Sequence, residues 1–308
     1  MKNEFRFPST DGKNQIHVIE WVPEGEVRGV VQIIHGMVEF IDRYDRFARV
    51  LNEAGYYVVG DDHLGHGATP ANEEDYGYFG EPDGCALVLG DIRRLYELTK
   101  EKYPEVPYVM MGHSMGSFFC RQYINLYSDE LAGAIVMGTG YQSPMTLKIA
   151  KFVAKNSAKR KGWRFRNATL VKMSMGAYNK RIKPLRTPVD WLTKDEAIVD
   201  AYVKNPWNNF MFTNNAYYGM FSCIEQCEKD ANLQRIRKDL PVLIVSGAED
   251  PVGSYGAGVK KVYEEYRRVG LTNAQMILYP NDRHEILNET DHEVVDKDIL
   301  DWLALIVK

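Results

Sequence analysis

The sequence contains few groups that could hold a metal ion or form a covalent cross-link. It has four cysteines among 308 residues, and none shows the spacing of a metal site. The last two lie one position too far apart for a redox-active C-x-x-C pair. We therefore expect buried, reduced thiols, and neither a metal ion nor a cofactor. The four are Cys85, Cys120, Cys223 and Cys227.

Long apolar runs are missing as well. No stretch reaches the roughly 20 apolar residues that a membrane-spanning helix needs, and residues 1–5 begin no signal-peptide core. Hydrophobic residues make up 45% and charged residues 26%, which is typical of a soluble globular protein. We therefore predict a cytoplasmic protein. Its length exceeds the usual single domain, so we expect one large domain with an insertion, or two domains.

Acidic residues are absent from one segment. Residues 144–186 contain thirteen lysines and arginines but no aspartate or glutamate, whereas the rest of the chain holds 25 basic and 42 acidic residues. One hypothesis is a cationic, amphipathic lid that contacts an anionic membrane surface or attracts an anionic substrate. The alternative is a solvated basic helix that leans on an acidic core. Nucleic acid is not an expected partner, because no recognition motif accompanies the charge.

Short apolar runs alternate with longer amphipathic ones along most of the chain. The short runs predict strands at residues 16–21, 29–34, 56–60, 108–111, 133–137, 242–246 and 275–279. The longer runs predict helices at residues 43–54, 85–103, 117–126, 256–268 and 291–307. This alternation favours an α/β fold with a mainly parallel central sheet and helices on both faces.

The alternation stops between residues 142 and 228. That stretch has four prolines, the basic run and an aromatic-rich end at residues 207–218, and it shows no regular strand pattern. We interpret it as a helical insertion that caps the sheet. The predicted organisation is therefore a first core part at residues 1–141, a helical cap at 142–228 and a second core part at 229–308.

The sequence G-H-S-M-G at residues 112–116 carries the strongest chemical signal. It lies between a predicted strand and a predicted helix, which is the setting of a nucleophile elbow. The flanking glycines relieve the crowding of a strained turn around Ser114. We therefore assign Ser114 as a candidate nucleophile. The alternative is an ordinary glycine-rich turn between a strand and a helix.

A serine hydroxyl needs a base, and the base needs an orienting acid. Asp250 directly follows a predicted strand, and His284 lies in the loop after the last one, which gives the order serine, acid, histidine. Glu249 and Asp282 are the competing acids. For the base, the alternative is that His284 is an ordinary surface histidine.

The negatively charged oxygen of a tetrahedral intermediate needs hydrogen-bond donors. In this architecture they are two backbone N–H groups, one after the nucleophile and one after an early strand. Met115 and Met37 occupy these two positions. The assignment rests on position alone, because backbone donors carry no side-chain signature.

Together these motifs resemble one family. H-G-M-V-E at residues 35–39, D-H-L-G-H-G at 62–67, the elbow, D-P-V at 250–252 and R-H-E at 283–285 are similar to the α/β-hydrolase group of monoacylglycerol lipases and bacterial lysophospholipases. The resemblance covers residues 1–140 and 229–308 and extends weakly into the cap. It implies an α/β-hydrolase fold and a carboxylic ester hydrolase in which Ser114 attacks, His284 is the base and Asp250 the acid. It also implies that His35 and Gly36 lie beside the substrate.

Two positions depart from the family pattern. Phe40 stands where a histidine is usual, and Leu64 replaces an arginine. Both concern the pocket that receives the alcohol rather than the triad, so the substrate stays open. We expect an acyl-enzyme mechanism on lipid-like monoesters, of monoacylglycerol or lysophospholipid type.

Two other functions compete with this prediction. A serine aminopeptidase of the same fold must hold a substrate ammonium, and residues 144–186 supply no carboxylate for it. A non-catalytic ligand-binding member would typically have lost a triad residue, and all three candidates are present here.

Overall fold

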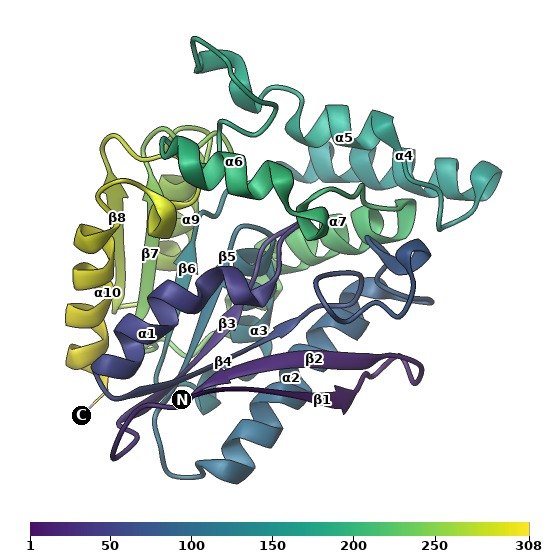
Figure 1. Cartoon of the computed structure of the whole chain (residues 1–308). Coiled ribbons are helices and arrows are strands. Elements are labelled where there is room, and N and C mark those ends of the chain that lie inside the picture. The colour runs from purple at the N-terminus through teal and green to yellow at the C-terminus, as the bar shows by residue number, and fades with distance from the viewer. Residues whose placement is uncertain (308) are drawn as a thin grey trace.

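The computed structural model describes residues 1–307 and is built on one eight-stranded sheet (Figure 1). The strand order is β1-β2-β4-β3-β5-β6-β7-β8. The first two pairings, β1 with β2 and β2 with β4, are antiparallel, and all the others are parallel. The predicted, mainly parallel sheet is confirmed. The strands are β1 (Lys2–Pro8), β2 (Gln15–Trp21), β3 (Gly29–Ile34), β4 (Tyr56–Asp62), β5 (Tyr108–His113), β6 (Gly133–Met137), β7 (Val242–Gly247) and β8 (Ala274–Tyr279).

Helices cover both faces of this sheet, as predicted. The apolar sides of α1 and α10 pack on one face, and those of α2, α3 and α9 pack on the other. Because β3 to β7 are buried on both sides, they are mostly apolar runs rather than alternating ones. These helices are α1 (Asp45–Glu53), α2 (Gly84–Lys102), α3 (Met115–Tyr127), α9 (Ala257–Arg268) and α10 (His292–Ile306).

The sequence did not predict β1. Only Phe7 of this edge strand is buried, so its residues lack the apolar run that marks a central strand. The strand is held in register by its pairing with β2 and by side-chain contacts of His17. That ring contacts Glu4 on β1 and Asp62 at the end of β4, at 3.2 and 2.8 Å.

Helices replace strands between β6 and β7. They are α4 (Pro144–Lys161), α5 (Ala168–Met175), α6 (Glu196–Lys204), α7 (Asn214–Glu228) and, after the insertion, α8 (Asp230–Leu233). We call residues 142–228 the cap; its division from the core as a separate domain stays a proposal. In Figure 1 these helices lie together above the sheet. Among residues 1–307, none of the helices is long and apolar enough to cross a membrane.

The parallel strands bring the predicted chemical groups to one edge of the sheet. Ser114 follows β5, Asp250 follows β7 and His284 follows β8. The carboxyl ends of adjacent parallel strands meet at the same edge, where ligands bind in open α/β sheets. The cap helices pack over this edge.

Candidate active site

Ser114 occupies a strained turn between β5 and α3. Its backbone has φ 54° and ψ −120°, a conformation that residues other than glycine rarely adopt. The close packing of the turn explains its glycines. A Cβ atom on Gly116 would lie 2.0 Å from the carbonyl oxygen of Ile34, and one on Gly112 would lie 2.2 Å from that of Gly116. The turn is fixed further because the Ser114 N–H donates to Met137 at 3.0 Å.

Asp250 and His284 form the second half of the site. His284 Nδ1 lies 3.0 Å from Asp250 Oδ2, and both side chains are buried. The carboxylate is held by Ser246 Oγ at 3.1 Å and by the Val252 N–H at 2.8 Å. Asp250 therefore fixes the imidazole with one nitrogen toward the acid.

The remaining ring nitrogen, His284 Nε2, is buried and has no hydrogen-bond partner within residues 1–307. Ser114 and His284 line the same cavity. Serine–histidine hydrogen bonds are often long before substrate binds, so this arrangement is compatible with His284 acting as the base for Ser114.

Two aromatic rings flank His284. The His113 ring lies 4.8 Å from it, centroid to centroid, and the Trp191 ring lies at 5.0 Å. Trp191 belongs to the cap, and its backbone neighbours bind the loop that carries the histidine. Glu285 N–H donates to Leu192 at 2.7 Å, and the Arg283 guanidinium donates to the Asp190 carbonyl at 2.7 Å. This contact could not be predicted from local sequence patterns, because it joins segments about 90 residues apart.

His35 and Gly36 lie behind the cavity wall rather than in it. The His35 ring is fully buried and stacks on His63 at 3.9 Å. Gly36 is also buried, and a Cβ atom there would lie 3.0 Å from Ser114 Cβ. The wall at this loop is formed instead by Met37, Val38 and Glu39. The structure therefore does not place His35 and Gly36 in contact with the cavity. Gly36 lets the loop pack closely against Ser114, and His35 packs against His63.

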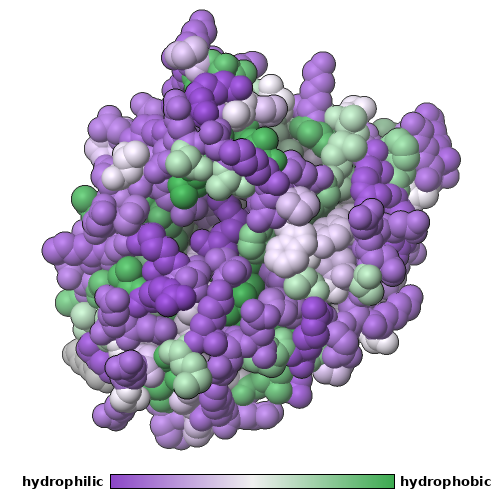
Figure 2. Space-filling view, in the orientation of Figure 1, coloured by the Kyte–Doolittle hydropathy of each residue, from purple (hydrophilic) through white to green (hydrophobic). Residues whose placement is uncertain are grey.

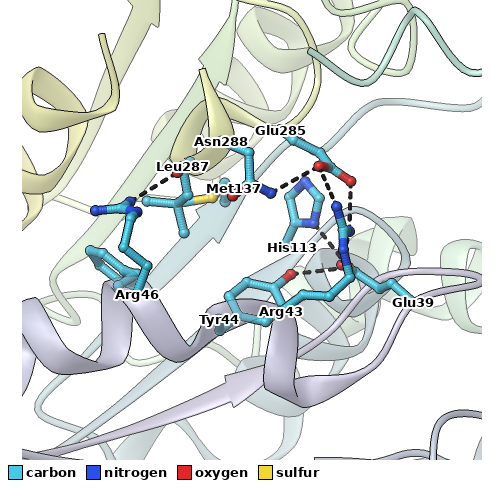
Figure 3. A pocket seen from close by; sticks show the side chains of 10 residues that line it. Glu39, Arg43, Tyr44, Arg46, His113, Met137, Glu285, Leu287 and Asn288 are labelled. Atoms are coloured by element: carbon cyan, nitrogen blue, oxygen red, sulfur yellow. Dashed lines mark hydrogen bonds and ion pairs between the residues drawn. The ribbon is translucent and has the colours of Figure 1, made fainter. Parts of the chain in front are cut away.

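A buried network of charges supports the loops on either side of the site (Figure 3). Arg43 binds Glu285 through two hydrogen bonds of 2.7 Å and Glu39 through a third of 2.7 Å. Glu39 also accepts from the Gly36 N–H and from Tyr44 at 3.0 Å. His113 completes the network, with Nδ1 at 3.2 Å from Glu39.

The network reaches both loops that carry candidate catalytic groups. Glu39 holds Gly36, one residue before the candidate donor Met37. His113 Nε2 lies 3.3 Å from the His284 carbonyl oxygen, and Glu285 is the next residue along the chain. Among the cavity-lining residues, Glu39 and Glu285 are thus engaged by Arg43 and His113 rather than free to bind a ligand.

The charges of this network shift one another's titration. Burial would raise the pKa of Glu39, but His113 and Arg43 outweigh it and hold that pKa well below its ordinary value. Burial would also raise the pKa of Glu285, and Arg43 again lowers it. Burial would lower the pKa of His113, but the hydrogen bond and charge of Glu39 raise it. Both carboxylates are therefore ionised at neutral pH, and the raised pKa of His113 favours its protonated form.

A cavity of about 790 Å³ lies between the cap and the sheet edge. Near the core it is lined by Ser114, His284 and residues 37–39 of the candidate oxyanion loop, as we call residues 36–39. Its far wall is almost wholly apolar and comes from α4, α5 and α7, including Leu147, Val171, Met220, Phe221 and Ile224. Within residues 1–307, no cluster of three or more His, Cys, Asp or Glu side chains is arranged to hold a metal ion.

The sheet order, the strained serine turn and the acid–histidine pair at one sheet edge define an α/β-hydrolase. The family model described as "Serine aminopeptidase, S33" matches residues 25–291, so the chain belongs to this α/β-hydrolase family.

Relatives match the chain over nearly its whole length. A monoacylglycerol lipase of Mycolicibacterium smegmatis is 24% identical over 98% of this chain and 97% of its own. The monoglyceride lipase of Saccharomyces cerevisiae is 26% identical over 97% and 93%. The crystal structure of a thermostable carboxyl esterase from Bacillus coagulans, in complex with glycerol, superposes with a TM-score of 0.93 at 31% identity, covering 100% and 99%. The chain is an α/β-hydrolase of the esterase and lipase type, similar to monoacylglycerol lipases.

Replacing Arg43 tests the buried network. In Arg43→Leu, Glu39 and Glu285 lose their guanidinium, and we expect the free energy of unfolding to fall by about 3–5 kcal/mol at pH 7. In the wild type these carboxylates have lowered pKa values, so their contribution is present above pH ~4.3 and is lost only as pH falls through their lower folded values. In the variant the uncompensated carboxylates take up protons more readily. The deficit should therefore shrink between pH 7 and pH 5, as measured by urea unfolding.

Arg46→Leu is the matched control. Arg46 pairs with Asp296, but its side chain is 38% exposed, so its loss should cost no more than about 1 kcal/mol. Equal costs for the two variants, or a cost for Arg43→Leu that does not change with pH, would contradict the proposed role of the network.

Proposed function

We propose that this enzyme hydrolyses monoesters of long-chain acids with a small hydroxylated alcohol, of the monoacylglycerol type, through an acyl-enzyme on Ser114. One observation carries the proposal: Ser114 and His284, whose ring is held by Asp250, line the same large and mainly apolar cavity. Its volume of about 790 Å³ lies in the upper part of the range of roughly 300–1,000 Å³ for small-molecule sites. An apolar far wall suits an acyl chain.

In the proposed mechanism, Ser114 Oγ attacks the ester carbonyl carbon while His284 Nε2 takes the hydroxyl proton. The buried Asp250 stabilises the resulting imidazolium. The N–H groups of Met37 and Met115 donate to the developing oxyanion. His284 then gives the proton to the departing alcohol, and a water molecule, activated by the same ring, releases the acid and restores Ser114.

The alcohol leaves beside His284, so the cavity wall there selects the alcohol. Tyr178 meets Trp191 edge to face, and Trp191 contacts His284. The next residue after Tyr178, Asn179, also lines the cavity. Asn179 Nδ2 donates to the Pro188 carbonyl at 2.6 Å. The other polar atom of this side chain, Oδ1, is buried and has no hydrogen-bond partner within residues 1–307. An acceptor in this place suits a hydroxyl of a glycerol-like alcohol.

The same wall disfavours a phosphate-bearing alcohol. The two carboxylates that line it, Glu39 and Glu285, are paired with Arg43 and His113, so neither of these cations is free to bind an anionic head group. Lys172, on α5, also lines the cavity, but it belongs to the mainly apolar wall that we assign to the acyl chain. Monoacylglycerol is therefore preferred to lysophospholipid as the proposed substrate.

The aminopeptidase alternative deserves a direct test, because the matching family model carries that description. A substrate ammonium would need a free carboxylate. Glu39 and Glu285 line the cavity but are paired with Arg43 and His113. This supports an ester rather than an aminoacyl substrate.

Triad variants and a substrate panel test the proposal together. Ser114→Ala and His284→Ala should lower kcat by on the order of 10⁴-fold or more on monooleoylglycerol, because neither leaves a base-activated nucleophile. Glu249→Gln and Asp282→Asn are the matched controls and should stay near wild type, since Asp250 rather than either of them contacts His284. Wild type should cleave monooleoylglycerol faster than lysophosphatidylcholine and should not cleave aminoacyl anilides. Faster anilide cleavage would reject the ester assignment.

We also propose that the cap contacts an anionic membrane surface through α4. Met145, Ile149 and Phe152 are 65%, 50% and 68% exposed and share one helix face. Lys148, Lys155 and Lys159 flank them and have no carboxylate within 4 Å among the described residues. Ile149 also lines the cavity, so this face adjoins the cavity wall. Figure 2 shows hydrophobic residues among hydrophilic ones at the upper edge, where Figure 1 places the cap.

Other parts of the basic segment match the alternative of a cap that leans on the core. Arg164 pairs with Asp75 at 2.9 Å, and Arg166 donates to three carbonyl groups of residues 73–76. Lys151 pairs with Glu225 at 2.9 Å. These three cationic side chains bind groups of the protein itself. The membrane proposal therefore rests on α4 rather than on the whole of residues 144–186.

Vesicle binding separates the two interpretations. We expect stronger binding to anionic than to neutral vesicles, weakened by salt, because unpaired lysines flank an apolar face. Changing Lys148, Lys155 and Lys159 to glutamate should abolish the preference, and Phe152→Ser should weaken binding at any salt concentration. The matched control changes Lys13, Lys238 and Lys260, which are exposed on the core, to glutamate. Equal weak binding to both vesicle types, or an equal loss in the control, would reject the proposal.

A further inference from the structure

Val38 adopts a backbone conformation that its side chain disfavours. Its φ is 57°, in the left-handed region, where β-branched residues are rare. Such a conformation persists only where the surroundings hold it, and it commonly marks a functional site. Val38 directly follows Met37, the proposed oxyanion donor, and lines the active-site cavity.

Two side chains of the cap hold this residue. Tyr202 Oη, on α6, donates to the Val38 carbonyl oxygen at 2.8 Å. Asn208 Nδ2, in the short 3-10 turn Pro206–Asn208, donates to the same oxygen at 2.8 Å. One carbonyl therefore accepts two hydrogen bonds, both from a segment more than 160 residues away in sequence.

Packing around these hydrogen bonds fixes the donors. The Arg43 guanidinium lies 4.9 Å from the centroid of the Tyr202 ring. Phe40 meets Trp207 edge to face at 5.1 Å. Asn208 is 5% exposed. The contact between residues 38–43 and 202–208 is therefore a packed joint rather than a single surface hydrogen bond.

The candidate oxyanion loop is thus anchored on both sides of the Met37 N–H. On one side, Glu39 accepts from the Gly36 N–H; on the other, the Val38 carbonyl is held by the cap. We propose that Tyr202 and Asn208 are positioning residues of the oxyanion hole, so that a docked cap sets the direction of the Met37 N–H. This inference rests on the proposed serine hydrolase function. It makes the cap part of the catalytic machinery as well as the wall of the acyl site.

The inference predicts a loss confined to the transition state. Removing one oxyanion donor typically lowers kcat by about 10²–10³-fold. A Met37 N–H that is present but misdirected should cost somewhat less. We expect about a 3- to 10-fold loss of kcat for Tyr202→Phe and for Asn208→Leu, because one hydrogen bond still holds Val38. The double variant should lose on the order of 10²-fold.

Three measurements on the full-length protein distinguish positioning from general damage. The first is kcat and KM on monooleoylglycerol. The second is inhibition by an alkyl boronic acid, whose tetrahedral serine adduct carries a negative oxygen at the oxyanion position. The third is inhibition by an ether analogue, 1-O-alkylglycerol, which binds without forming an oxyanion. The boronic acid should lose affinity in parallel with kcat, while the ether analogue should stay within about 2-fold of wild type.

Asn209→Leu is the matched control. Its amide donates to carbonyl groups of Val203 and Asn205 within the cap, and it lies on the surface rather than in the cavity wall. It should leave all three measurements unchanged.

A folded double variant that keeps kcat within 2-fold would overturn the inference. So would a loss that appears equally with the boronic acid and the ether analogue, since that pattern indicates general binding. If the double variant does not fold, Tyr202→Phe, which keeps the ring and its packing, decides by the same comparison. Wild-type enzyme that forms no serine adduct and hydrolyses no ester would refute the proposed function instead.

Discussion

The site depends on one constraint, the close approach of the turn after β5 to its neighbours in the sheet. Gly116 packs against the Ile34 carbonyl so tightly that any side chain would collide with it. This contact lets the chain bend sharply at Ser114 and enter α3, which leaves the hydroxyl at the cavity floor with φ 54°. Because the strands are parallel, the same sheet edge carries the loops of Asp250 and His284. The cluster thus follows from the fold.

The surrounding side chains restrict how these loops can move. Arg43 joins Glu39, on the candidate oxyanion loop, to Glu285, on the loop of His284, although these residues are far apart in sequence. Cap residues also bind each loop, at Leu192 for the loop of His284 and at Tyr202 and Asn208 for the candidate oxyanion loop. Such a buried ion-pair network is weak evidence for stability on its own, since desolvation offsets much of its attraction. Its value here lies in fixing geometry, which catalysis by preorganised donors requires.

Much of the fold could be predicted from the sequence, because the signals were local. Central strands such as residues 29–34 and 133–137 are almost wholly apolar, and their predicted bounds match β3 and β6. The elbow was recognisable because a strained serine needs glycine on both sides. The edge strand β1 was missed, since an exposed strand carries no apolar run.

The support of the site was not predictable in the same way. The contact of Trp191 with His284 and the two hydrogen bonds to Val38 join segments far apart in sequence. The types of the residues involved do not indicate these contacts. Glu39 and Glu285 lay within recognisable motifs, but nothing local indicated that Arg43 joins them. His35 and Gly36 show the converse: they lie in a motif beside the site, yet burial places them behind Met37 and Val38. Sequence position located the loop but not the direction of its side chains.

The most direct test of the central claim is to trap the covalent intermediate. The enzyme is mixed with a long-chain p-nitrophenyl ester, quenched in acid within milliseconds, digested and examined by mass spectrometry. An acyl group should be found on the peptide that contains Ser114, and in no comparable amount elsewhere. Ester hydrolysis that proceeds at full rate with the acyl group on another residue, or with Ser114 replaced by alanine, would contradict the assignment of this serine as the nucleophile.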